Sequence, residues 1–184
     1  MRFALKARTS CTHARLDDAL SELSLAQRSS FITFLRTQHL AYRALHLLVP
    51  NDHWVSGVID EMKALLTADL GVLDVSGTAR PMIGAVPPMH PLGVAYVICG
   101  SHFGKRVLRS RWLKSADTAV LGACSYLDSD VLALGWKSFL SDLDELPDPA
   151  RDLPVLAADA DRTFSIFYDS LLTVKHRETA HAAA

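Results

Sequence analysis

The sequence predicts an all-α protein built as a single domain. Its 184 residues suit one domain, and 49% of them are hydrophobic, which is enough for a sizeable core. Hydrophobic side chains recur near the helical period along most of the chain, and no segment alternates with a period of two for long enough to be a strand. The 9 glycines and 8 prolines are fewer than a β-sandwich with many tight turns would use. We therefore expect six or so helices and no sheet.

The expected helices follow in order from apolar spacing and from residues that begin or end helices. Residues 4–20 form the first, because leucines recur there at helical spacings without a glycine or proline. Ser24-Leu-Ala-Gln27 is a capping-box pattern and predicts a second helix, which Pro50 ends. A third is expected over about 53–70, and a long loop rich in proline and glycine follows over 71–91.

The second half of the chain predicts three more helices, over 92–114, 130–146 and 157–176. Gly100 and Gly104 interrupt the first of these. The last two are separated by a linker from Pro147 to Pro154. The predicted domain spans 1–176, and 177–184 is expected to be a disordered tail.

Charge and cysteine content exclude several classes of protein. The 19 basic and 20 acidic residues give a net charge of −1, so no global field favours nucleic acid or an anionic membrane. Three scattered cysteines suit free thiols in a reducing cytosol better than a disulfide framework or a zinc site. The N-terminal residues lack a signal-peptide pattern, and the longest uncharged apolar run, 92–99, is far shorter than a membrane span. We expect a soluble, cytoplasmic protein.

The first helix carries a candidate metal ligand, His13. Lys6, Thr9, His13 and Asp17 share one helical face, and a carboxylate one turn after a histidine can accept from its Nδ1–H. That hydrogen bond would leave Nε2 free, as in many metal-binding histidines. The alternative is a surface helix with ordinary polar residues, since the chain has eight histidines.

A second candidate is Gly100-Ser-His-Phe-Gly104. Two glycines four residues apart share one helical face, and each costs about 1 kcal/mol of helix stability relative to alanine. Their missing side chains let a flat ligand or another helix approach the backbone closely. The segment alone leaves both readings open.

Taken together, these segments resemble the haem oxygenases of bacteria. Leu5-Lys-Ala-Arg-Thr-Ser-Cys-Thr-His13 is similar to the proximal helix of that family, and Tyr96-Val-Ile-Cys-Gly-Ser-His-Phe-Gly104 to its distal helix. Lys63-Ala-Leu-Leu-Thr-Ala-Asp69-Leu resembles the third-helix pattern. Two later segments, Gly135-Trp-Lys-Ser-Phe-Leu and Thr163-Phe-Ser-Ile-Phe, resemble the last two helices more weakly.

The resemblance implies an enzyme that uses molecular oxygen to cleave haem b to biliverdin, carbon monoxide and ferrous iron. Haem would lie between the two helices, as both substrate and prosthetic group, with His13 as the ligand of its iron. Gly100, Ser101 and Gly104 would form the distal, catalytic wall. The residues expected to hold the rest of the haem are Lys6, Thr9, Asp17, Tyr96 and Arg111.

The chain departs from the family at Lys105, where a second small residue is common. At about 100° per residue, the Lys105 side chain points well away from the direction of Gly104. A haem-binding or haem-sensing protein without turnover is therefore an alternative, and a helical domain without haem is a remoter one.

The most basic stretch of the sequence, Lys105-Arg-Val-Leu-Arg-Ser-Arg-Trp-Leu-Lys114, directly follows the glycines. Five of its ten residues are basic and none is acidic. Complementary charge speeds encounters between proteins, so we expect the electron donor, such as a ferredoxin or a flavin reductase, to dock there. A bilin-using phytochrome is a further expected partner. The alternative is an ordinary solvated helical face.

Overall fold

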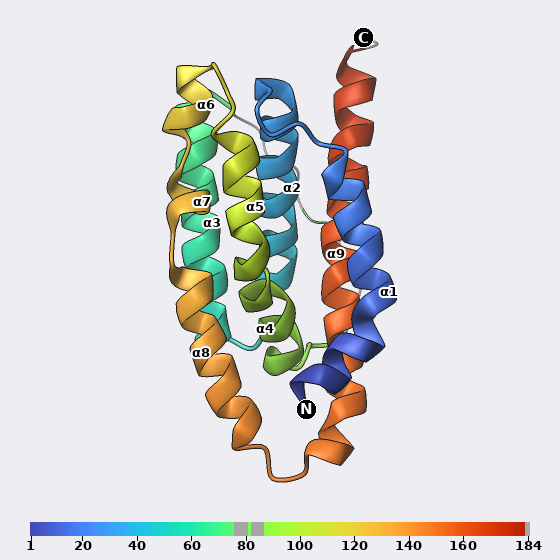
Figure 1. Ribbon diagram of the computed structural model, residues 1–184. Helices are drawn as coiled ribbons and strands as arrows, with labels where there is room; N and C mark the ends of the chain where they lie inside the picture. The colour runs from blue at the N-terminus through green and yellow to red at the C-terminus, as the bar shows by residue number, and fades with distance from the viewer. Residues whose placement is uncertain (76–80, 82–86, 183–184) are drawn as a thin grey trace.

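Helices make up all the regular structure in a computed structural model that describes residues 1–75, 81 and 87–182 (Figure 1). The chain forms one all-helical domain, which confirms the predicted fold class. The long helices are α1 (Arg2–Ser21), α2 (Arg28–His46), α3 (Trp54–Val72), α4 (Pro91–Gly100), α5 (His102–Trp112), α8 (Val131–Asp144) and α9 (Pro149–Ala182). Two short helices, α6 (Thr118–Gly122) and α7 (Ser125–Asp128), lie between α5 and α8.

The long helices form a bundle with its core around α2, α4 and α9. Helix α2 packs against α3 and α9, and α4 packs against α8 and α9. Phe31, Phe34 and Tyr42 on α2 are at most 1% exposed and fill the middle of the core. Helix α1 lies beside α9 and runs in the same direction (Figure 1). None of the helices in the described part of the chain is long and apolar enough to cross a membrane.

Two histidines begin helices instead of lining a site. Nδ1 of His53 accepts a hydrogen bond from the main-chain N–H of Val55 at 3.3 Å, and Nδ1 of His90 accepts one from Leu92 at 3.2 Å. Each ring thereby satisfies an N–H that the first helical turn leaves without a partner. The start of α3 falls where the sequence predicts it.

Helix α2 starts later than the capping-box prediction. It begins at Arg28, and its N-cap residue, Gln27, makes no side-chain capping bond. Ser24 instead sits in a turn, where its carbonyl accepts from the main-chain N–H of Gln27. The neighbouring leucines, Leu23 and Leu25, are buried, and their packing fixes this turn outside the helix.

Helix α9 is longer than predicted at both ends. The expected Pro147–Pro154 linker is wrong, because Oδ1 of Asp148 accepts from the N–H of Arg151 and caps a helix that starts upstream of Pro154. The expected disordered tail is wrong for residues 177–182, which are helical. Glu178 accepts hydrogen bonds from Thr33 at 2.7 Å and from Arg36 at 3.3 Å, so α2 holds this end. Residues 183–184, and residues 76–80 and 82–86 of the predicted loop over 71–91, lie outside the described residues.

The two short helices depend on carboxylates. Asp117 caps α6 by accepting from the N–H groups of Ala119 and Val120. The fully buried Asp69 on α3 accepts from the N–H groups of Ser125 and Tyr126, both at 2.8 Å, and so holds the start of α7. Burial raises the pKa of the Asp69 carboxyl, and these hydrogen bonds oppose that rise.

The expected helix over 92–114 is divided at Ser101 into α4 and α5. The Ser101 hydroxyl donates to the carbonyl of Ile98 at 2.6 Å, and Nδ1 of His102 lies 2.7 Å from the carbonyl of Cys99. Side chains that bond to carbonyls of the preceding turn compete with the helical ladder, which accounts for the break.

Gly93 permits the closest helix contact of the core. A Cβ atom at Gly93 would lie 2.8 Å from Cβ of Asp159 and 2.9 Å from the carbonyl oxygen of Leu156 on α9. We predict that Gly93→Ala lowers the free energy of unfolding by about 1–3 kcal/mol through overpacking. Gly57→Ala is the control, because a Cβ there meets nothing within 4 Å. Urea unfolding of both variants tests this, and an equal effect of the two would contradict it.

Candidate functional site

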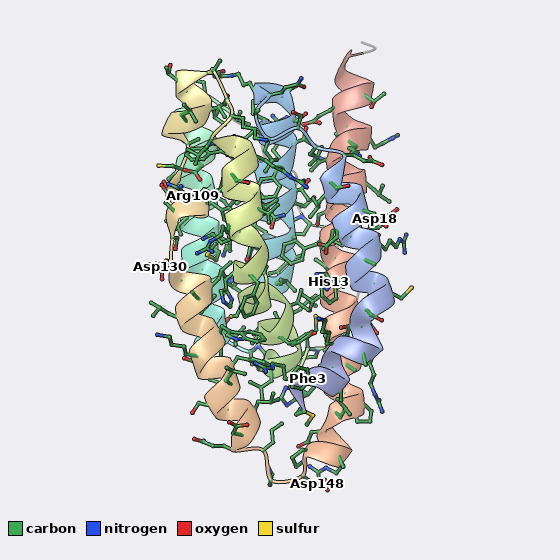
Figure 2. The ribbon with its side chains drawn as sticks, viewed as in Figure 1. Phe3, His13, Asp18, Arg109, Asp130 and Asp148 are labelled. Atoms are coloured by element: carbon green, nitrogen blue, oxygen red, sulfur yellow. The ribbon has the colours of Figure 1, made fainter. Side chains whose placement is uncertain are left out.

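A large cavity opens between α1 and α5 and reaches inward to α2, α4, α8 and α9. Its volume is about 830 Å³, within the usual range for small-molecule sites. Figure 2 shows Phe3 and His13 reaching from α1 toward the side on which α5 lies. Eight of the nine site residues predicted from sequence line this one cavity, namely Lys6, His13, Asp17, Tyr96, Gly100, Ser101, Gly104 and Arg111.

The cavity mouth carries large apolar side chains in contact with solvent. Phe3 is 75% exposed, Phe103 is 65% exposed and Val107 is 53% exposed, and all three line the cavity. Their rings and methyl groups come from the two facing helices, α1 and α5. Exposed apolar surface gathered around a concavity is typical of a site for an apolar ligand.

His13 lies on the α1 wall and is half exposed, at 49% for the side chain. Its ring stacks on Phe164 of α9, with the centroids 4.9 Å apart and the planes at 20°. Asp17, one turn later, approaches the imidazole as predicted, but the paired atom is Nε2, 3.2 Å from Oδ2. The expectation that Nε2 is free and Nδ1 is paired is therefore wrong for this ring orientation.

Thr9 does not reach the cavity. It is 1% exposed, and its hydroxyl donates to the carbonyl of Leu5 at 3.0 Å within α1. The same helical face that presents His13 carries Thr9 toward the interior, because α1 buries Leu5, Thr9 and Leu16. Thr9 therefore belongs to the packing of α1 and not to the lining that the sequence predicted for it.

The two glycines of the opposite wall differ in what surrounds them. A Cβ at Gly104 would meet nothing within 4 Å, whereas one at Gly100 would lie 3.3 Å from the ring of Trp136 on α8. Gly104 leaves open space beside α5, and Gly100 makes room for an aromatic side chain. Ser101 lines the cavity, but its hydroxyl proton is already donated to the carbonyl of Ile98.

Cations stand on both sides of the cavity. Lys6 and Arg111 are exposed and line it from α1 and α5. Arg111 lies seven residues after Gly104, about two helical turns, so both share one face of α5. Tyr96 lies deeper, between α4 and α8, with its ring centroid 6.0 Å from that of Phe139. All three residues line the cavity, and their expected contacts with haem stay a prediction.

Sequence reasoning missed the polar inner end of the cavity. The Tyr126 hydroxyl donates to Oε1 of Gln38 at 3.2 Å, and both residues line the cavity with Tyr42. Burial raises the pKa of Tyr126 and that of Tyr42 well above their ordinary values, which keeps both phenols protonated as donors. Gln38 and Tyr126 are 88 residues apart in sequence, so no local pattern signals their meeting.

Within the described residues, no group of three or more His, Cys, Asp or Glu side chains comes together to hold a metal ion. A scan of the sequence against models of protein families finds no match. A search of curated proteins also finds none. The functional interpretation therefore rests on the residues and geometry of the cavity between α1 and α5.

Gly104 offers a test of whether this cavity binds apolar ligands. We predict that Gly104→Leu keeps or raises the free energy of unfolding, since leucine favours a helix by up to about 1 kcal/mol over glycine. It should weaken binding of an apolar fluorescent dye several-fold by occupying the open space. Gly57→Leu is the matched control, because its position is equally open but lies on α3. Equal dye binding by the two variants would contradict a cavity site.

Proposed function

We propose that this protein is a haem oxygenase, which oxidises haem to biliverdin, carbon monoxide and ferrous iron with molecular oxygen and an external electron donor. One observation carries the proposal. His13 on α1 and the glycine-containing wall of α4 and α5 line the same apolar cavity from opposite sides. The resemblance of these two segments to the proximal and distal helices of the family supports the same interpretation.

The residues present fit haem in shape and in charge. Haem is a flat, apolar macrocycle with two carboxylates at one edge and an iron that needs an axial ligand. The cavity offers aromatic walls, exposed cations at Lys6 and Arg111, and a half-exposed imidazole at His13. A lone histidine suffices as a protein ligand, because four nitrogens of the macrocycle already hold the iron. Haem would supply the iron that activates oxygen and the ring that is cleaved.

On the α1 side, His13 and Asp17 act as a unit. The carboxylate of Asp17 lies one turn after the imidazole, with its Oδ2 3.2 Å from Nε2, so it is close enough to orient the ring. Since half of the His13 side chain is exposed, the ring has room to turn about its Cβ–Cγ bond and present a nitrogen to the cavity. The ring of Phe164 stacks on one face of the imidazole.

On the α5 side, the cavity has open space beside Gly104, and hydroxyl groups lie at its inner end. Gly104 lets the backbone approach a flat ligand, because no side chain intervenes. The Tyr126 and Tyr42 hydroxyls at the inner end can hold water in an otherwise apolar cavity. Lys6, near the start of α1, and Arg111, near the end of α5, are cations that line the cavity, and a pair between either one and the carboxylates of the substrate would fix its rotation.

A haem-binding or haem-sensing protein without turnover is the second candidate, and one observation favours it. The Ser101 hydroxyl donates to the carbonyl of Ile98, so it does not offer its proton to a ligand on the distal side. A site that binds haem but lacks a distal donor at this position would bind without cleaving.

Turnover of the aerobic ferric haem complex separates the two candidates. With ascorbate as reductant and catalase present to remove free peroxide, we expect the Soret band to decay and a broad red absorption of biliverdin to replace it. Carbon monoxide should be released in parallel. A Soret band that persists under these conditions would favour the binding protein, and failure to bind haem at a one-to-one ratio would exclude both.

His13 is the residue on which binding and turnover most depend. We predict that His13→Ala changes the Soret band and stops biliverdin formation, and that added imidazole restores part of both. Asp17→Ala should lower affinity or activity by about tenfold, since it only orients the ligand. His176→Ala is the control, because His176 is exposed on α9 and does not line the cavity. Unchanged spectra and rates in His13→Ala would remove this histidine from the site.

The surface expected to receive the electron donor is smaller than the sequence suggests. Lys105 is buried, and Nε of Arg109 lies 2.6 Å from Oδ1 of Asp128, so neither extends freely from α5. Arg106, Arg111 and Lys114 are exposed there. Arg111 also lines the cavity, which leaves Arg106 and Lys114 as the cations best tested for docking.

We predict that Arg106→Glu with Lys114→Glu slows ferredoxin-driven turnover by roughly tenfold at low salt, while ascorbate-driven turnover survives. The wild-type rate with ferredoxin should fall as ionic strength rises from ~0.01 to ~0.15 M, where the Debye length is ~8 Å. Lys137→Glu with Arg177→Glu changes the same charge elsewhere on the exposed surface and is the control. Equal losses with both reductants would show that these charges serve haem binding or folding.

A further inference from the structure

Helix α5 forms one wall of the large cavity, yet few of its side chains are buried. Of its eleven residues only Lys105 and Trp112 are buried. They lie seven residues apart, about two turns, and so share one face of the helix. Gly104 and Arg111, also seven apart, form the neighbouring face that lines the large cavity. The position of the cavity wall therefore depends on what Lys105 and Trp112 contact.

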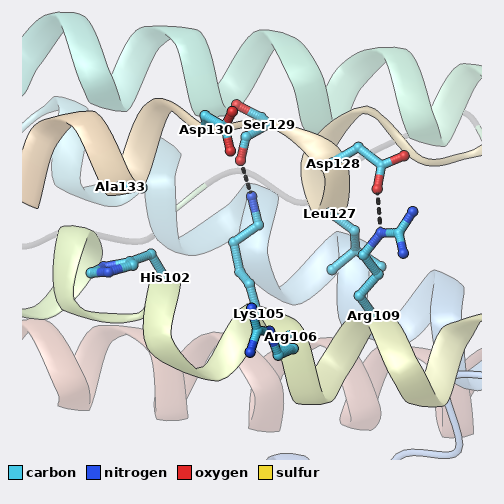
Figure 3. Close-up of a pocket in the computed structure, with 9 residues that line it drawn as sticks. All are labelled: His102, Lys105, Arg106, Arg109, Leu127, Asp128, Ser129, Asp130 and Ala133. Atoms are coloured by element: carbon cyan, nitrogen blue, oxygen red, sulfur yellow. Dashed lines mark hydrogen bonds and ion pairs between the residues drawn. The ribbon is translucent and has the colours of Figure 1, made fainter.

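Lys105 is tied to the connection between α7 and α8. Its ammonium donates a hydrogen bond to the main-chain carbonyl of Ser129, as Figure 3 shows, and lies 5.7 Å from the ring centroid of Tyr126. Lys105 is 8% exposed, and it lines both the large cavity and a second cavity of about 460 Å³ on the other side of α5. It thus extends away from Gly104, as the helical geometry predicts from the sequence.

Trp112, the other buried side chain of α5, also donates a hydrogen bond to a main-chain carbonyl. Nε1–H of Trp112 donates to the main-chain carbonyl of Val120 in α6 at 2.8 Å. Both buried side chains of α5 therefore end in a hydrogen bond to a carbonyl of the segment that contains α6, α7 and the start of α8. An ion pair between Arg109 and Asp128 lies between them and is drawn in Figure 3, but both of its side chains are over 40% exposed. Such exposed pairs contribute little.

Burying an ammonium costs free energy unless hydrogen bonds and opposite charges compensate for the lost water. Burial lowers the pKa of Lys105, and the carboxylates of Asp130 and Asp128 partly oppose this. A methionine of similar length would fill the same space without that cost. The lysine therefore makes physical sense as a directional tether, since a carbonyl acceptor specifies one position for the helix and apolar packing specifies a range of positions.

We propose that Lys105 is a positioning residue that fixes α5 against the α7–α8 connection and thereby sets the distance of the glycine wall from α1. Trp112 is the second anchor at the other end of the same helix. That the wall then holds haem rests on the function proposed above, whereas the tether itself does not. The side chain of Lys105, the residue that departs from the family pattern, is held away from Gly104 by its hydrogen bond to the carbonyl of Ser129.

Amide hydrogen exchange of the protein without haem tests the tether directly. With Lys105→Met, we expect amides of α5 to exchange about tenfold faster or more, since a hydrogen bond to a charged donor is lost. Amides of α2 and α9 should keep their rates. Trp112→Phe keeps an aromatic side chain but removes the indole N–H, and should loosen α5 in the same way. Lys105→Arg retains a cationic donor with room in the adjoining cavity, and should restore slow exchange.

The control is Lys137→Met, which makes the same substitution on the exposed face of α8. Unchanged α5 exchange in both Lys105→Met and Trp112→Phe would overturn the proposal. A parallel increase in all helices would overturn it too, because it would make Lys105 an ordinary core residue.

Release of ferric haem to excess apomyoglobin gives the second measurement. We expect it to be about tenfold faster in Lys105→Met, and also faster in Trp112→Phe, whose residue does not line the large cavity, than in the wild type or Lys137→Met. An unchanged release rate, with faster α5 exchange, would overturn the link between the tether and the cavity wall. If the wild type binds no haem, the proposed function fails, and the exchange experiment still decides the tether.

Discussion

The packing of α1 along α9 is the constraint on which the cavity depends. Leu5, Thr9 and Leu16 are the side chains that α1 buries. Polar contacts to α9 reinforce this packing along the helix. Arg15 lies over the ring of Tyr168 at 3.8 Å, and Lys175 pairs with Glu22 at 2.8 Å. Because these contacts all join α1 to α9, the other side of α1 is left to face α5 across open space.

The same constraint determines which residues face that space. His13 stands at the boundary between the buried face of α1 and the cavity, where Phe164 of α9 supports its ring. On the other side, Lys105 and Trp112 draw α5 toward the short helices. Helix α1 is thus held by α9, and α5 is held by the segment from α6 to α8. Because these contacts lie on the sides of α1 and α5 away from the cavity, a ligand can enter between the two helices without breaking them.

Much of the fold could be predicted from periodicity, because most helices bury one stripe of apolar side chains. Lys6, His13 and Asp17 could be placed together for the same reason, since one helix fixes their relative positions. Local patterns failed where a side chain competed with the backbone. Ser101 and His102 divide a predicted helix, and Asp148 starts another upstream of Pro154.

Long-range contacts were the other source of error. Glu178 keeps the C-terminal turns of α9 helical by bonding to α2, more than 140 residues earlier in the chain. Tyr126 and Gln38 meet at the inner end of the cavity through folding alone. The ring orientation of His13 and the inward direction of Thr9 depend on how α1 rolls against α9, and helical spacing does not specify that rotation.

A crystal structure of the protein grown with one equivalent of ferric haem tests the haem site most directly. Electron density for the macrocycle should lie between α1 and α5, with a nitrogen of His13 bonded to the iron and the carboxylates directed toward Lys6 or Arg111. Haem bound elsewhere on the molecule, or bound in this cavity through a residue other than His13, would contradict the assignment.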